Sequence, residues 1–166
     1  MPDEFNAESG QAYYAGSTED VIRFCKALNI DGGRLSAVKP ISIVSYMKTA
    51  EDIINGMLSE SYFLPIKPYN QVDANGIPHL VFPGRLRYLA QQMTAGLLML
   101  TEFQHQEQNM NEAGQKLFEE AKKEVYQLTL WNHRIPGARW KSSESHFAPP
   151  HVMPPHPLVD QIWSMN

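Results

Sequence analysis

Apolar residues recur with a helical period in four stretches of the chain, separated by polar or proline-rich segments. These stretches lie at 17–30, at about 41–62, at about 85–107 and at about 112–131. In the first, four apolar residues follow the spacing i, i+3, i+4, i+7, which places them on one helix face: Val21, Phe24, Cys25 and Leu28. The pattern predicts an all-α protein built as a small four-helix bundle.

The expected helix ends carry local signals. Ser17 with Asp20 three residues later resembles a capping box. The Asp-Gly-Gly sequence at 31–33 is expected to end this first helix. Pro40 suits the start of the second helix, where a missing N–H costs little.

Residues 63–84 interrupt the helical pattern and contain four prolines. Asn75-Gly76 lies between two strand-like runs and is a strong hairpin signal. We expect an inserted loop or a small two-stranded projection here. Such a ribbon is marginally stable alone and requires a neighbour.

The third expected helix is apolar on most sides around Leu97, Leu98 and Met99. Such a helix lies either at the centre of the fold or against a second subunit. These three residues are therefore our candidates for a subunit interface.

The composition changes after His133, where six of the twelve prolines and two of the three tryptophans occur. We expect a helical domain at 1–133, with an N-terminal arm at 1–16, and an extended C-terminal docking arm at 134–166. Proline reduces the entropy lost when such an arm is ordered on a partner. Five large apolar residues are the expected anchors: Trp140, Phe147, Leu158, Ile162 and Trp163. The alternative is a disordered tail.

Charge and cysteine content narrow the function classes. The formal net charge of −4 argues against a surface that grips nucleic acid. The single cysteine, Cys25, excludes an internal disulfide and is expected to pack in the core. The longest apolar run, at 95–100, is too short to span a membrane. These features predict a soluble protein of a reducing compartment.

No pattern in the chain indicates catalysis, a metal or a cofactor. Glu102 and His105 provide only half of a di-metal bundle motif, which needs a second copy and two more glutamates. Three histidines lie five residues apart in the proline-rich tail: His146, His151 and His156. In an extended chain the outer two are roughly 30 Å apart, so they cannot share an ion without a fold-back. We expect a protein that is not an enzyme.

Four stretches together resemble the head–tail adaptor (head-completion or connector) proteins of tailed bacteriophages. They are STEDVIRFCKALNI, AEDIINGMLSESYFLPI, RLRYLAQQMTAGLLMLTEF and QKLFEEAKKEVYQL. The second is the most specific, because family members show a similar I-N-x-x-L…Y-x-L-P run before the third helix. The resemblance covers residues 17–131 and departs at 68–83, which is longer than the usual link, and in the long tail.

The resemblance implies a non-catalytic ring, typically of twelve copies, below the portal protein at the capsid vertex. Such a ring extends the channel for genomic DNA and is the platform for a tail or stopper protein. It implies a place in the virion neck, reached by assembly in the host cytoplasm, and a C-terminal extension that docks on the portal.

A channel wall should repel phosphates rather than bind them, which fits the mildly acidic chain. The candidates for channel-facing carboxylates are Glu51, Asp52, Glu119, Glu120 and Glu124.

Three other readings remain open. A stopper or tail terminator of the same kind of particle would be richer in strands. A small helical enzyme would need a metal site that the sequence does not reveal. A helical DNA-binding regulator is disfavoured by the acidic charge and by the lack of a basic recognition helix.

Overall fold

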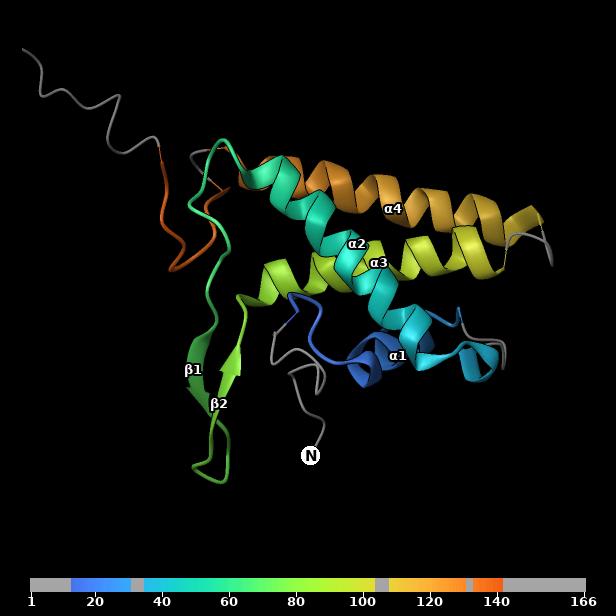
Figure 1. The fold of residues 1–166 in the computed structure, drawn as a ribbon, viewed down its shortest axis with the longest axis horizontal. Helices are drawn as coiled ribbons and strands as arrows, with labels where there is room; N and C mark the ends of the chain where they lie inside the picture. The colour runs from blue at the N-terminus through green and yellow to red at the C-terminus, as the bar shows by residue number, and fades with distance from the viewer. Residues whose placement is uncertain (1–12, 31–34, 104–107, 131–132, 142–166) are drawn as a thin grey trace, which may run out of the picture.

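The computed structural model describes residues 13–30, 35–103, 108–130 and 133–141. In these ranges the chain is mainly helical, with four α-helices, a short 3₁₀ turn and a two-stranded sheet (Figure 1). The elements are α1 (Thr18–Ala27), the turn Leu35–Ala37, α2 (Pro40–Leu58), β1 (Tyr69–Val72), β2 (Pro78–Val81), α3 (Gly84–Glu102) and α4 (Gln108–Leu128).

The start of α1 confirms the predicted capping box. The backbone N–H of Asp20 donates to Ser17 Oγ at 3.2 Å, and the backbone N–H of Ser17 donates to Asp20 Oδ2 at 3.0 Å. The helix ends at Ala27, three residues before the predicted end.

Helix α1 is closed at Asn29, and the Asp-Gly-Gly sequence at 31–33 that was predicted to end it lies outside the described residues. Asn29 has a φ of 54°, the left-handed conformation that commonly closes a helix. Its N–H donates to the carbonyl of Lys26, and the N–H of Ile30 donates to the carbonyl of Cys25. Both bonds satisfy carbonyls that the helix end leaves open.

The other helices occur where the periodicity predicts them, with shifted ends. Helix α2 ends at Leu58, four residues early, and α4 starts at Gln108, four residues early. These differences arise because side-chain periodicity indicates a buried face and not the residue at which the backbone turns.

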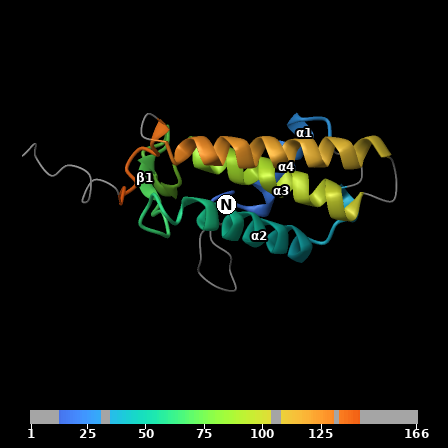
Figure 2. The ribbon, with the colours of Figure 1, turned by 90° about the horizontal axis from the view of Figure 1, so that it is seen from above.

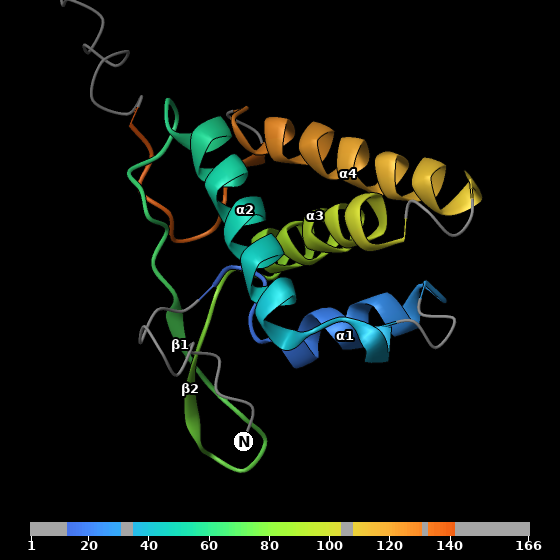
Figure 3. The same ribbon diagram turned by 45° about the vertical axis from the view of Figure 1, so that its right-hand side comes forward.

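Helices α3 and α4 lie side by side and antiparallel (Figures 1 and 2). Helix α2 crosses α3, and α1 lies against α3 on the side away from α4 (Figures 1 and 3). Leu98 and Met99 are buried in the core of their own chain, while Leu97 is part-exposed. The interface prediction is therefore wrong for Leu98 and Met99. Helix α3 is apolar on most sides because the other helices of the same chain cover it.

Glycines allow α3 and α4 to approach closely. A Cβ at Gly96 would lie 2.9 Å from the backbone nitrogen of Phe118, and one at Gly114 would lie 2.7 Å from Met99 Cβ. Neither distance accommodates a side chain without movement of the helices. The sequence analysis did not single out these two positions.

The predicted hairpin is confirmed. Strands β1 and β2 are antiparallel, with Tyr69 opposite Val81 and Val72 opposite Pro78. The turn runs through Asp73–Gly76, and Gly76 has a φ of 80°. The hairpin extends away from the helices (Figures 1 and 3).

In the described part of the chain, no helix combines the length and the apolar character that crossing a membrane requires.

Candidate functional site

The buried side chain of Tyr62 connects three segments of the chain. Its hydroxyl donates to the carbonyl oxygen of Leu128 at the end of α4, at 2.6 Å. The same hydroxyl accepts a hydrogen bond from the backbone N–H of Ile135, at 3.0 Å. One side chain from the segment after α2 therefore holds the end of α4 and the start of the C-terminal segment.

Backbone pairing continues this junction along the C-terminal segment. The N–H of Phe63 donates to the carbonyl of Arg139 at 3.0 Å, and the N–H of Lys141 donates to the carbonyl of Ser61 at 2.9 Å. The ring of Trp140 meets the ring of Tyr62 edge-on, with centroids 4.8 Å apart. Residues 134–141 thus pack on the helical body, although the sequence analysis assigned them to the arm.

Cationic side chains cover the aromatic rings of the junction. The guanidinium of Arg134 lies 4.9 Å from the centre of the Trp140 ring, and that of Arg139 lies 4.6 Å from the centre of the Phe63 ring. Contacts of this kind are stabilising, by about 0.5–1 kcal/mol at exposed sites. They further hold residues 134–141 on the helical body.

A second buried network holds the segment before α1. The backbone N–H of Tyr14 donates to Glu51 Oε2 at 2.9 Å, and its hydroxyl donates to Asn55 Oδ1 at 2.8 Å. The hydroxyl also accepts from the N–H of Ile66 at 2.9 Å, just before the hairpin. Burial raises the pKa of Tyr14 to about 12. Tyr14 and Ala15, predicted as part of an N-terminal arm, are core residues.

Glu51 does not face solvent, so it is not a channel-lining residue of this structure. Only 8% of it is exposed, and burial raises the pKa of its carboxyl group. The sequence indicates the burial of Glu51, because this residue lies on the apolar face of α2. Four residues of this face follow the spacing i, i+4, i+7, i+11: Met47, Glu51, Ile54 and Leu58.

The other four predicted carboxylates are exposed, and three of them lie in ion pairs on α4. Glu119 pairs with Lys122 at 3.4 Å, Glu120 pairs with Lys116 at 3.9 Å, and Glu124 pairs with Arg85 of α3 at 2.8 Å. Exposed pairs of this kind contribute little to stability. They reduce the local excess of negative charge on α4. Among the described residues, Asp52 is the one exposed candidate carboxylate without such an ion pair.

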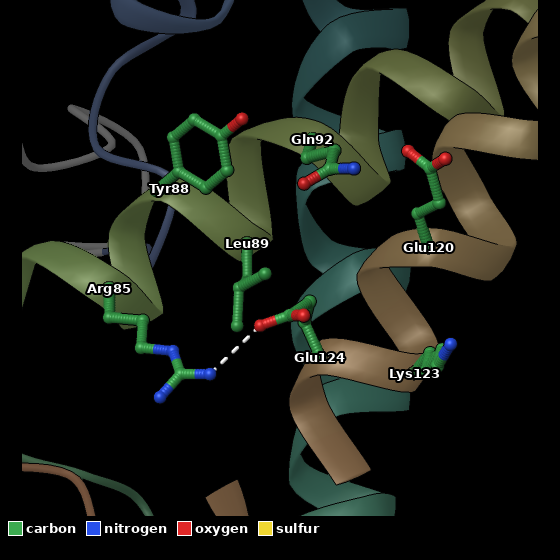
Figure 4. A pocket seen from close by; sticks show the side chains of 7 residues that line it. All are labelled: Arg85, Tyr88, Leu89, Gln92, Glu120, Lys123 and Glu124. Atoms are coloured by element: carbon green, nitrogen blue, oxygen red, sulfur yellow. Dashed lines mark hydrogen bonds and ion pairs between the residues drawn. The ribbon is translucent and has the colours of Figure 1, made fainter. Parts of the chain in front are cut away.

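An open hollow of about 480 Å³ lies between α3 and α4, and Figure 4 shows its lining side chains. Arg85 and Glu124 point toward each other across it, while the ring of Tyr88 stays on the side of α3. The hollow combines cations and anions that neutralise each other. Its chemistry therefore favours no particular class of ligand.

Some of the remaining predicted site residues lie in the described part of the chain, and others lie outside it. Trp140 packs within its own chain, whereas Phe147, Leu158, Ile162 and Trp163 lie outside the described residues, as do His105 and the three tail histidines. Cys25 is buried, as predicted. Among the described residues, no three His, Cys, Asp or Glu side chains are grouped so that they could hold a metal ion.

The fold and the junction define a mainly helical protein whose terminal segments are both tied to the stretch 50–66. No protein-family model matches the chain, and no curated protein or solved structure shows significant similarity to it.

Proposed function

We propose that the chain is a head–tail adaptor of a tailed bacteriophage. In this proposal its four helices form the bundle of one ring subunit. About twelve subunits assemble below the portal, as the resemblance implies. The ring carries a tail or stopper protein. Genomic DNA passes through the ring without specific binding. The subunit acts in the virion neck and performs no catalysis.

The observation that carries the proposal is the anchorage of residues 134–141 on the helical body. Tyr62, Leu128 and Ile135 hold the start of this segment, and backbone bonds hold it up to Lys141. A subunit that docks through a C-terminal arm requires such an anchorage, because a contact made by the arm holds the folded domain in place only if the two are firmly connected. The four apolar anchors beyond Lys141 remain candidates for contact with the portal or a neighbouring subunit.

The stretch that carries the family resemblance also gains a physical explanation. Ile54 and Leu58 are buried, Asn55 accepts from Tyr14, and Tyr62 binds both α4 and the C-terminal segment. These residues join the segments 13–15 and 134–141 to α2 and to the residues that follow it. Because the named positions of this motif are buried or hydrogen-bonded, the motif supports the proposal that the chain shares the fold of the adaptor family.

The structure reduces the number of candidate residues for the channel surface. With Glu51 buried, the exposed candidates are Asp52 on α2 and the paired carboxylates of α4: Glu119, Glu120 and Glu124. Leu97 is the one residue of the three apolar candidates that reaches the surface and could meet a neighbouring subunit.

Binding to the portal protein encoded in the same genome tests the proposal. The full chain is expected to co-elute with the portal ring on a sizing column. A version ending at Lys141 is the correct truncation, because one ending at His133 would also remove the buried Ile135 and the packed Trp140. If the arm docks, this truncation loses binding while its helical circular dichroism is unchanged. Absence of binding by the full chain would contradict the proposal.

A further inference from the structure

The hairpin exposes apolar side chains and a strand edge. Tyr69, Val72 and Ile77 are 49%, 62% and 45% exposed, and all four residues of β1 are exposed. Within the described ranges, the sheet consists of β1 and β2 only. Two-stranded ribbons are marginally stable and usually gain a covering partner.

The register shows which backbone groups point outward. The N–H of Asp73 donates to the carbonyl of Ile77, and the N–H of Ile77 donates to Oδ1 of the Asp73 side chain. The two residues therefore face each other with their bonding groups turned inward, next to the turn. Antiparallel pairs alternate, and the backbone groups of the next pair, Val72 and Pro78, therefore point away from the partner strand. The same alternation turns the backbone groups of Asn70 and Leu80 outward.

The two edges of the hairpin are not equivalent. On β2, one of the outward positions is Pro78, which has no N–H to donate. On β1, Asn70 and Val72 both present an N–H and a carbonyl. Neither strand contains an Asp, Glu, Lys or Arg side chain, the common device that prevents edges from pairing, so the proline alone distinguishes the two edges. The open edge is therefore β1.

We propose that β1 pairs with β1 of a second copy of this chain, antiparallel and across a two-fold axis at Asn70. Each Asn70 then lies opposite its own copy and exchanges two N–H···O bonds with it. The N–H of each Val72 reaches the carbonyl of Pro68 in the other copy. The two hairpins form one four-stranded antiparallel sheet.

Charge complementarity selects the second copy as the occupant. In this register, Lys67 of one chain lies opposite Asp73 of the other, and the two-fold axis produces this pair twice. Opposite charges placed across neighbouring strands attract, whereas like charges would repel. The edge is thus complementary to itself, with uncharged residues at its centre and opposite charges at its two ends.

This contact goes beyond the adaptor proposal and does not depend on it. A two-fold interface uses the β1 edge of each chain once, so it stops at a dimer and cannot close a ring. A ring needs a different, head-to-tail surface. The two associations are therefore separable by mutation.

Sedimentation of the full chain over a concentration series tests the dimer, with Asn70→Pro and Asn70→Thr as matched variants. Proline at 70 removes an outward N–H but no bond between β1 and β2. We expect the wild type and Asn70→Thr to dimerise and Asn70→Pro to dimerise at least tenfold more weakly, with equal helical circular dichroism. A wild type that stays monomeric would overturn the proposal. This outcome includes the case in which another segment of the chain or another protein covers β1. A dimer that Asn70→Pro does not weaken would also overturn it.

Disulfide cross-linking tests the register itself. Opposed residues of a hydrogen-bonded antiparallel pair have Cα atoms about 5.5 Å apart, within disulfide range. An Asn70→Cys variant should therefore form a covalent dimer under mild oxidation, while the native Cys25 is buried. Val72→Cys is the control, because its two copies would be offset by four residues, roughly 13 Å. Faster cross-linking of Val72→Cys than of Asn70→Cys would contradict the two-fold axis at Asn70.

Discussion

The hydroxyl of Tyr62 donates a hydrogen bond of 2.6 Å to the carbonyl oxygen of Leu128, a residue 66 positions further along the chain. Because the same oxygen accepts from the N–H of Ile135, removing it leaves two buried backbone groups without this partner. The hydroxyl oxygen of Tyr62 therefore joins three segments of the chain through two hydrogen bonds.

We expect Tyr62→Phe to lower the free energy of unfolding by about 1–3 kcal/mol, the cost of unsatisfied buried polar groups. The ring contact with Trp140 is kept, so the loss reports the hydroxyl. Urea unfolding measures it, with Tyr126→Phe as control, since Tyr126 is 59% exposed. Equal stability of the Tyr62→Phe variant and the wild type would show that the junction does not hold α4.

A second prediction concerns the contact between α3 and α4. Gly96→Ala should be destabilising by about 1–3 kcal/mol, because its Cβ would press on the backbone of Phe118. Gly56→Ala is the matched control in α2: nothing lies within 4 Å of its Cβ position. This control should be stabilising by about 0.5–1 kcal/mol, since alanine favours helix. Thermal unfolding of both variants checks the opposite signs, and a stabilising Gly96→Ala would refute the close approach.

The helices and the hairpin could be predicted from sequence because their signals are local. Periodic apolar residues identified all four helices, and Asn75-Gly76 identified the hairpin. The helix ends were less accurate: Asn29 ends α1 by its own backbone conformation, which periodicity does not reveal.

The features that could not be predicted depend on contacts between distant segments. The role of Gly96 can be recognised only when α4 is known to lie against α3. The role of Tyr62 can be recognised only when Ile135 is known to lie beside its hydroxyl group. Leu98 and Met99 resembled an interface because a central helix and a subunit surface have the same apolar pattern. Only the packing of α2 and α4 against α3 distinguishes the two.

A third prediction follows from the buried carboxylate of Glu51. Burial raises its pKa above the ordinary value of 4.5. A group with a raised pKa contributes stability that is fully present below its unfolded pKa and is lost as the pH rises through the folded value. The Glu51→Gln variant keeps an oxygen for the Tyr14 N–H but does not titrate. Its stability relative to the wild type should therefore increase as the pH rises above about 4.5.

Urea unfolding of wild type and Glu51→Gln at several pH values measures this difference. Glu60→Gln serves as control, because Glu60 is exposed in the turn after α2 and its replacement removes the same charge. A stability difference for Glu51→Gln that stays constant over this pH range would exclude a raised pKa.

The central claim is that the chain forms a ring below a portal. Electron microscopy of the full chain mixed with the portal protein from the same genome tests it most directly. The account predicts a second ring of density, coaxial with the portal and on its capsid-distal side, which is absent when the chain ends at Lys141. Portal particles that look the same with and without the full chain would contradict the account.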